Sequence, residues 1–261
     1  MFNPDKVKIR QSFAAASITY DGAAELQRTV GKALLAGVSA ETLSGRLMDL
    51  GCGTGFLTAE LLSDNPRQSM IAVDIAMGML NATRGKLINH NNVSYVCADA
   101  ELLPVAASTL DGVVSNLALQ WCRNLEAVFA DLKRVIKPGG QLVFSTFGPQ
   151  TLQELKAAWA EVDDYSHVNE FYDVKELEVF LRQAGFRQLQ IESRTYVSSY
   201  DSVLDLMHEL KAIGAQNVIG ERSKTITTKL QLQKMITAYE TRRVNSKIPA
   251  TYECLFVQAR A

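Results

Sequence analysis

The sequence predicts an α/β protein with a seven-stranded, mostly parallel sheet. A glycine-rich turn at residues 49–55 joins a short apolar strand to a segment with helical apolar spacing. This is how a nucleotide-binding α/β unit begins. Strand-like and helix-like segments then alternate from Leu47 to Phe147, which favours parallel pairing with right-handed crossovers.

The strands are short apolar segments separated by turn residues or helical segments. We expect them at residues 46–50, 69–73, 93–97, 111–115, 141–147, 186–197 and 252–259. Helices are expected at residues 56–62, 125–136, 151–161 and 174–184. The stretch Lys137-Pro138-Gly139-Gly140 should end the second of these helices in a tight turn, and Gly185 should cap the last.

Two helical regions stand outside this alternation. Residues 1–40 carry a loose apolar stripe, and they either pack against one sheet edge or form a lid over a ligand, with Tyr20 facing it. Residues 198–248 carry amphipathic patterns and read as a helical cap inserted before the last strand, where we expect substrate choice to reside. Because no linker or repeat interrupts the chain, residues 1–261 form one domain.

Composition narrows the function classes. The formal charge is -1, so no overall field favours nucleic acid or an anionic membrane. No apolar run approaches the roughly 20 residues of a membrane span, and the first residues lack a signal-peptide core. The four cysteines form no C-x-x-C pair, which argues against a metal site and for reduced thiols in the cytoplasm.

The glycine turn indicates the kind of ligand. Its glycines are Gly51, Gly53 and Gly55, but the third glycine of a dinucleotide fingerprint would fall at Phe56. Asp49 stands just ahead of the turn, where a carboxylate would repel a pyrophosphate and attract a cation. S-adenosyl-L-methionine, which has a sulfonium and an ammonium but no phosphate, suits such a turn. The alternative is an ordinary strand-to-helix turn with glycines for packing.

Two further acids follow successive strands. Asp74, followed by Ile75, lies about 20 residues past the turn, where a carboxylate can accept from ribose hydroxyls. Asp99, followed by Ala100, is placed to accept from an adenine amino group. Each alone could be a turn former or helix cap. Together with Asp49 they meet at the carboxyl edge of the sheet, where open α/β folds bind ligands.

These residues resemble the motifs of the Rossmann-like class I S-adenosylmethionine-dependent methyltransferases. Asn116 matches the position whose backbone approaches the cofactor's amino group. Longer stretches resemble one family, the malonyl-acyl carrier protein O-methyltransferases of biotin synthesis, from the lid to the cap. They are Phe13 to Ala16 with Tyr20, Leu26 to Arg28, Ser115 to Cys122, His167 to Phe171, and Leu210 to Ala215. A mild departure is Thr54, where some members carry proline.

The resemblance implies a substrate and a partner. The enzyme would methylate the free carboxylate of a malonyl group carried on acyl carrier protein or coenzyme A. The ester would then prime the pimeloyl chain for biotin, without nucleic acid or a membrane. Two rival functions remain open at this point: another O- or N-methyltransferase of small molecules, and a non-catalytic regulator that binds S-adenosyl-L-methionine.

A carboxylate acceptor is ionised at pH 7 and needs no general base, so the site must mainly orient it. Candidate donors are Tyr20, His167 and Lys211, although the last two are as readily a packed histidine and a solvated charge. Trp121 and Phe171 are candidates for the substrate-pocket wall.

A basic stretch within the cap suggests where an acidic carrier would bind. Residues 221–247 hold seven positive and two negative side chains, which gives a net +5. We expect Arg242, Arg243 and the nearby lysines to dock the carrier. The alternative is a solvated helical face.

Overall fold

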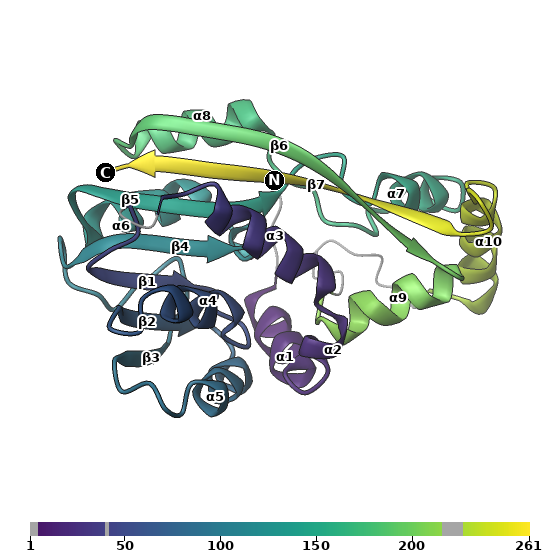
Figure 1. The fold of residues 1–261 in the computed structure, drawn as a ribbon. Helices are drawn as coiled ribbons and strands as arrows, with labels where there is room; N and C mark the ends of the chain where they lie inside the picture. Colours follow the sequence, from purple (N-terminus) through teal and green to yellow (C-terminus); the bar gives the residue numbers. More distant parts are fainter. Residues whose placement is uncertain (1–4, 40–41, 216–226) are drawn as a thin grey trace.

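A mixed seven-stranded sheet forms the centre of the molecule (Figure 1). The structure is a computed structural model that describes residues 5–39, 42–215 and 227–261. The strand order is β3-β2-β1-β4-β5-β7-β6. β1 to β5 pair in parallel, whereas β7 runs antiparallel to both β5 and β6. The strands are β1 (Arg46–Leu50), β2 (Ser69–Asp74), β3 (Val93–Cys97), β4 (Leu110–Asn116), β5 (Ile136–Phe147), β6 (Arg187–Tyr200) and β7 (Ile248–Arg260).

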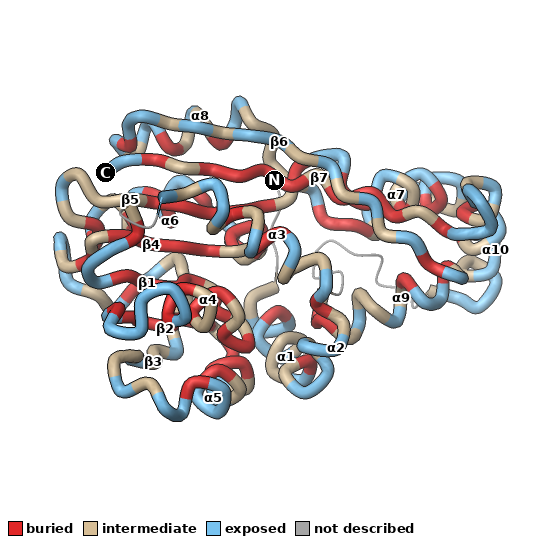
Figure 2. Tube along the Cα trace, in the orientation of Figure 1, coloured by how far each residue is buried: buried red, intermediate tan, exposed pale blue. Residues whose placement is uncertain are grey.

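Helices cover both faces of the sheet because alternate strand residues point to opposite sides (Figure 2). One apolar cluster joins β1, β2 and β4 to α3 (Glu25–Ala36) and α4 (Phe56–Asp64), and α5 (Met77–Lys86) packs on β2 and β3. The other joins the opposite face to α6 (Leu125–Val135) and α8 (Val174–Gln183). The large side chains of Phe129 and Phe144 meet there, with ring centroids 5.6 Å apart.

The β6–β7 ribbon extends beyond the rest of the sheet and carries the cap. β5 stops pairing at Phe147 opposite Cys254, whereas β6 and β7 stay paired out to Tyr200 and Ile248. The helices α7 (Gln153–Ala160), α9 (Val203–Ala212) and α10 (Lys229–Glu240) gather around this extension (Figure 1). Both strands are therefore longer than the sequence predicts, and the described part of the cap between them contains α9 and α10.

The predicted tight turn at residues 137–140 is wrong in one respect, because these residues belong to β5. The helix α6 already ends at Val135, and Ile136 pairs with Leu110 of β4. Gly139 keeps the positive φ, +81°, that a turn would need. Its N–H donates to the carbonyl of Ala261 at 2.8 Å, so the end of the chain extends the sheet alongside this segment.

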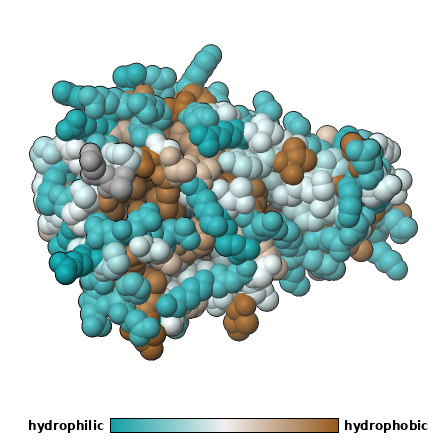
Figure 3. Space-filling view, viewed as in Figure 1, coloured by the Kyte–Doolittle hydropathy of each residue, from teal (hydrophilic) through white to brown (hydrophobic). Residues whose placement is uncertain are grey.

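The first helices, α1 (Lys6–Ala16), α2 (Tyr20–Ala23) and α3, precede the first strand as expected. α1 packs on α5 and α2 touches α9, so this lid lies between the sheet edge and the cap (Figure 1). The face of the molecule seen in Figure 3 is mostly hydrophilic, with scattered apolar patches. Within the described residues, none of the helices has the length and apolar character needed to cross a membrane.

Candidate active site

The glycine turn is fastened to the neighbouring strands. The N–H groups of Gly51 and Cys52 both donate to the carbonyl of Val73 in β2, at 2.8 and 3.0 Å. Gly51 has a φ of +72°, and a Cβ there would overlap the side chain of Ala118 beyond β4. Only glycine permits both this conformation and this approach. Gly53 then donates its N–H to Asp74 Oδ2 at 2.9 Å, which binds the turn to the end of β2.

Two buried carboxylates lie beside this turn without an ion-pair partner among the described residues. Asp49, only 1% exposed, accepts a hydrogen bond from Thr58 Oγ1 at 2.6 Å. Asp74, 8% exposed, also accepts from the N–H of Ala76 at 2.8 Å. Burial raises the pKa of Asp49 to about 7 and that of Asp74 to about 6. Their negative charges are therefore costly until a cation arrives.

Asp99, at the end of β3, is engaged differently. The amine of Lys6 lies 2.5 Å from Asp99 Oδ2 and 2.6 Å from Glu101 Oε2. Lys6 belongs to α1, so this pair of contacts ties the lid to the third acid. Sequence reasoning missed Lys6 because no pattern in the chain links position 6 to position 99.

A small cavity runs along this edge of the sheet. Of the predicted cofactor residues it is lined by Gly51, Gly53, Asp74, Ile75, Asp99, Ala100 and Asn116. Asp49 lines an adjoining cavity that also touches Gly51, Gly53 and Asn116. Gly55 does not belong to these walls: it precedes α4 with a φ of +84° and faces Thr83. Its part in the turn is therefore conformational.

S-adenosyl-L-methionine fits this set of groups. A carboxylate has about four acceptor positions, and two backbone N–H groups leave Asp74 able to accept from ribose hydroxyls. The unpaired charges of Asp49 and Asp74 suit a ligand that carries a sulfonium and an ammonium. A phosphate in the same place would meet the two buried carboxylates, which form no ion pair among the described residues.

The lid closes over the turn through Tyr20 and Asp21. Tyr20 is half-buried and contributes to the walls of all three cavities. Asp21 Oδ1 accepts from Thr54 Oγ1 at 2.6 Å, and its Oδ2 lies 2.6 Å from the amine of Lys86. These contacts place the Tyr20 ring against the turn. Asp21 was not predicted as a site residue, although it follows Tyr20 in the sequence. Its contact with Thr54, 33 residues away, becomes visible only in the folded protein.

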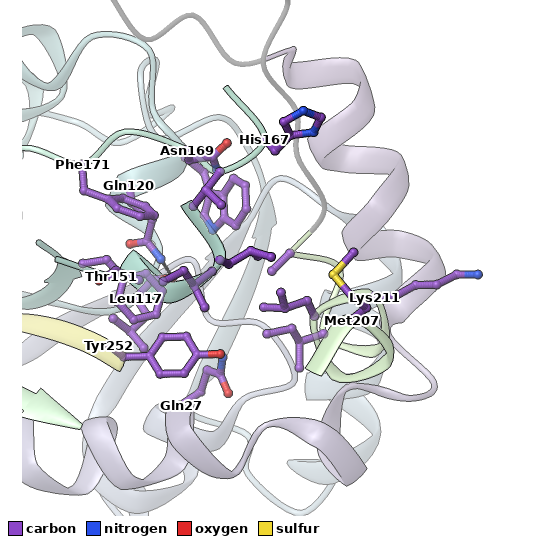
Figure 4. Close-up of a pocket in the computed structure, with 18 of the residues that line it drawn as sticks. Gln27, Leu117, Gln120, Thr151, His167, Asn169, Phe171, Met207, Lys211 and Tyr252 are labelled. Carbon is purple, nitrogen blue, oxygen red and sulfur yellow. Dashed lines mark hydrogen bonds between the residues drawn. The ribbon is translucent and has the colours of Figure 1, made fainter. Parts of the chain in front are cut away.

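A second, larger cavity of about 460 Å³ lies between the sheet edge, the lid and the cap (Figure 4). The predicted wall residues Trp121 and Phe171 both line it. It shares Phe13, Tyr20, Leu117 and Trp121 with the small cavity. A substrate in the large cavity can therefore reach a ligand in the small one across a common wall.

The structure places the predicted donors His167 and Lys211 at this cavity but in a poor arrangement for orienting an anion. His167 Nε2 lies 2.8 Å from Asp163 Oδ1, and its ring stacks on Trp159 at 3.7 Å between centroids. Lys211 is exposed, and Figure 4 shows its amine directed away from the other cavity residues. Their expected role as carboxylate donors is therefore not supported by this geometry.

Arg242 and Arg243 lie beyond the end of α10 and do not line the cavity. Arg242 Nη2 is 3.1 Å from Glu161 Oε1, and Arg243 Nη2 is 2.6 Å from Glu240 Oε2. Glu161 lies outside the basic stretch and offsets one of its positive charges, whereas Glu240 is already counted in the net +5. The start of the basic stretch, residues 221–226, lies outside the described residues.

Two polar residues of the large cavity were missed as site residues. Gln27 and Asn169 line it, and the buried carboxamide oxygen of each has no hydrogen-bond partner among the described residues. The only signal in the sequence was that each stands inside one of the family-like stretches. An isolated amide gives no periodic pattern, so only the fold reveals its position.

Comparisons with known proteins agree with this architecture. Residues 48–144 match the family model of a methyltransferase domain. The chain is 41% identical to the malonyl-[acyl-carrier protein] O-methyltransferase of Methylococcus capsulatus, over 97% of this chain and 92% of that protein. It is 42% identical to the biotin biosynthesis bifunctional protein BioHC of Cellvibrio japonicus, over 97% of this chain but only 50% of that protein.

Among solved structures, the chain resembles a Haemonchus contortus phosphoethanolamine N-methyltransferase 2 in complex with S-adenosyl-L-methionine. The TM-score is 0.59 at 14% identity, covering 95% of this chain and 57% of that one, so this likeness supports the fold. The sequence similarity extends over nearly the whole chain, cap and lid included. The chain belongs to the malonyl-[acyl-carrier protein] O-methyltransferase family.

Proposed function

We propose that this protein transfers a methyl group from S-adenosyl-L-methionine to the free carboxylate of a malonyl thioester, carried on acyl carrier protein. The observation that supports this most is the pair of cavities with a common wall. One lies beside the glycine turn and the buried acids, and the other is large and mostly apolar. The names of the relatives supply the substrate, and the bifunctional relatives connect it to biotin synthesis.

The residues of this chain would act by binding, orienting and excluding water. The glycine turn with Asp49, Asp74 and Asp99 would hold S-adenosyl-L-methionine, which when bound supplies an electrophilic methyl group. The malonyl carboxylate is ionised near pH 7, so no residue has to take a proton from it. Tyr20, Trp121 and the cap would close the acceptor off from solvent, which strengthens the electrostatic interactions inside.

The direct test is a methyl-transfer assay on the purified protein with S-adenosyl-L-methionine and malonyl-acyl carrier protein. Malonyl-coenzyme A, free malonate and a panel of small phenols and amines serve as competing acceptors. We expect a base-labile methyl ester on the malonyl thioester and far slower reaction with the small acceptors. Methylation of a phenol or amine in preference, or cofactor binding without any transfer, would contradict the proposal.

Asp74 should make cofactor binding depend on pH. In the free protein burial raises the pKa of Asp74 to about 6 and that of Asp49 to about 7. Below these pH values each carboxyl group is mostly protonated, and binding of a cationic ligand displaces the proton. Affinity for S-adenosyl-L-methionine should therefore increase from pH 5.5 to pH 8, as measured by calorimetric titration. Asp74→Asn should flatten that dependence, and Asp74→Ala should weaken binding about tenfold or more.

The same carboxylates set the stability of the cofactor-free protein. Their folded-state pKa values are raised above the unfolded value, so the folded protein binds more protons between about pH 4 and pH 7. The free energy of unfolding should fall as pH rises through that window, and less steeply in Asp74→Asn. A denaturation series without cofactor measures both slopes, and equal slopes would remove Asp74 from this account.

Tyr20→Phe should lower turnover more than it weakens cofactor binding. Burial and the nearby Asp74 raise the pKa of the Tyr20 hydroxyl, so it stays protonated and can donate to an acceptor carboxylate. A loss of about tenfold in kcat corresponds to one hydrogen bond to a charged group. Tyr20→Ala is the companion variant: if neither change alters turnover, the ring only packs against the turn.

Carrier docking at the cap rests on charge. Among the described residues Lys229 and Lys234 on α10 are exposed and form no ion pair, whereas Arg242 and Arg243 are paired with glutamates. Acyl carrier proteins are acidic, so α10 is the surface we propose for encounter, with the two arginines at its end.

Lys229→Glu combined with Lys234→Glu should raise the KM for malonyl-acyl carrier protein and leave cofactor affinity unchanged. The wild-type KM should also rise with salt, because exposed charges are screened over about 10 Å at 0.1 M. Arg242→Glu combined with Arg243→Glu is the comparison variant. Indifference of KM to both double variants and to salt would place docking elsewhere on the protein.

A further inference from the structure

The carboxamide of Gln27 is left without a partner at the boundary between the cavities. Its Oε1 atom is buried and has no hydrogen-bond partner among the described residues, and its Nε2 atom donates to none of them. Gln27 lines the large cavity and also the cavity that touches Asp49, Gly51 and Gly53. Buried polar groups normally find partners, so an unpaired carboxamide in this position points to a ligand.

The backbone of Gln27 is fixed although its side chain is not. Asn116 Nδ2 donates to the carbonyl of Gln27 at 2.8 Å, and Ser145 Oγ donates to Asn116 Oδ1 at 2.7 Å. These bonds hold α3 against the ends of β4 and β5. Because Asn116 also lines the small cavity, Gln27 is held at the edge where the reacting groups would meet.

Asn169 also carries a carboxamide, but it lies at a different part of the large cavity. Its Oδ1 is also buried and unpaired, and it lines only the larger of the cavities described above. Figure 4 draws Gln27 and Asn169 on opposite sides of the cavity, with Leu117 between them. Gln27 is therefore the carboxamide at the methyl-transfer end.

We propose that the Gln27 carboxamide donates an N–H to the acceptor carboxylate and orients it for methyl transfer. This inference rests on the proposed function, since it takes a carboxylate as the acceptor. With His167 engaged by Asp163 and Lys211 directed away, Gln27 and Tyr20 are the donors that line both the large cavity and the cavity beside Asp49 and the glycine turn.

A neutral donor suits this reaction better than a cation would. The attacking carboxylate loses its negative charge as the new oxygen–carbon bond forms, so its charge is greatest in the ground state. An ion pair with a lysine or arginine would stabilise that ground state more than the transition state and slow the reaction. An amide N–H fixes the direction of the oxygen with a weaker preference for the full charge.

The test compares binding of the reactant and of the product to the complex with S-adenosylhomocysteine, in which no transfer occurs. The ligands are malonyl-N-acetylcysteamine, which carries the carboxylate, and its methyl ester, which does not. In Gln27→Met, which keeps the length but removes the amide, we expect the carboxylate ligand to bind about tenfold more weakly. The ester should bind within about twofold of wild type, and kcat should fall.

Matched variants separate this role from packing. Gln27→Glu keeps the shape but faces the carboxylate with a second negative charge, so it should bind the carboxylate ligand more weakly than Gln27→Met. Gln183→Met, an exposed exchange on α8, should change neither ligand. If Gln27→Met does not fold, Gln27→Ala carries the same comparison.

Two failures are distinguishable. Equal weakening of both ligands in Gln27→Met, or no weakening of either, would overturn the role of Gln27 while leaving the malonyl thioester as the substrate. Failure of the wild-type protein to bind or methylate the malonyl thioester would instead overturn the proposed function on which this inference rests.

Discussion

The carboxyl edge of the sheet is organised by buried negative charge. Asp49 lies one residue before the end of β1, Asp74 ends the adjacent strand β2, and each is almost fully withdrawn from solvent. Hydrogen bonds from Thr58, Gly53 and Ala76 hold them in place, yet burial still outweighs these bonds and raises both pKa values. A free protein that keeps this arrangement loses stability near neutral pH, and a cationic ligand restores it.

The lid helices are held against the same edge of the sheet by ion pairs and a hydrogen bond. Lys6 pairs with Asp99 and Glu101, while Asp21 binds Thr54 inside the glycine turn and pairs with Lys86 on α5. Asp99 lines the small cavity, and Thr54 and Lys86 line the cavity beside the turn, so the lid is held by groups that the proposed cofactor would also contact. A ligand that takes Asp99 as its acceptor competes with Lys6 for that carboxylate. Such a ligand would therefore change how α1 is held against the edge of the sheet.

The sequence predicted those parts of the fold and site that depend on neighbours along the chain. Strand ends followed by acids, a turn with three glycines and the strand–helix alternation are all local patterns. The outer ends of β6 and β7 were missed because they pair with each other across the intervening cap. Pro249 is tolerated in β7 because that part of the strand lies beyond β5 and has β6 as its partner. Gln27, Asn169 and Lys6 were missed for a related reason: their partners, or lack of them, depend on segments about 90 residues or more away.

The sheet and the cap differ in how many neighbouring strands support them, and this difference suits them to different roles. The residues that we propose for the cofactor stand at the ends of parallel strands, of which β1, β2 and β4 are paired on both sides and β3 forms the edge of the sheet. The larger cavity is walled partly by helices on a two-stranded ribbon, which has fewer neighbours and can vary in length or tilt without disturbing β1 to β5. Tyr20, Gln27 and Asn116 join the two regions. Substrate choice can therefore change in the cap while the geometry of methyl transfer stays with the sheet, provided that this junction is kept.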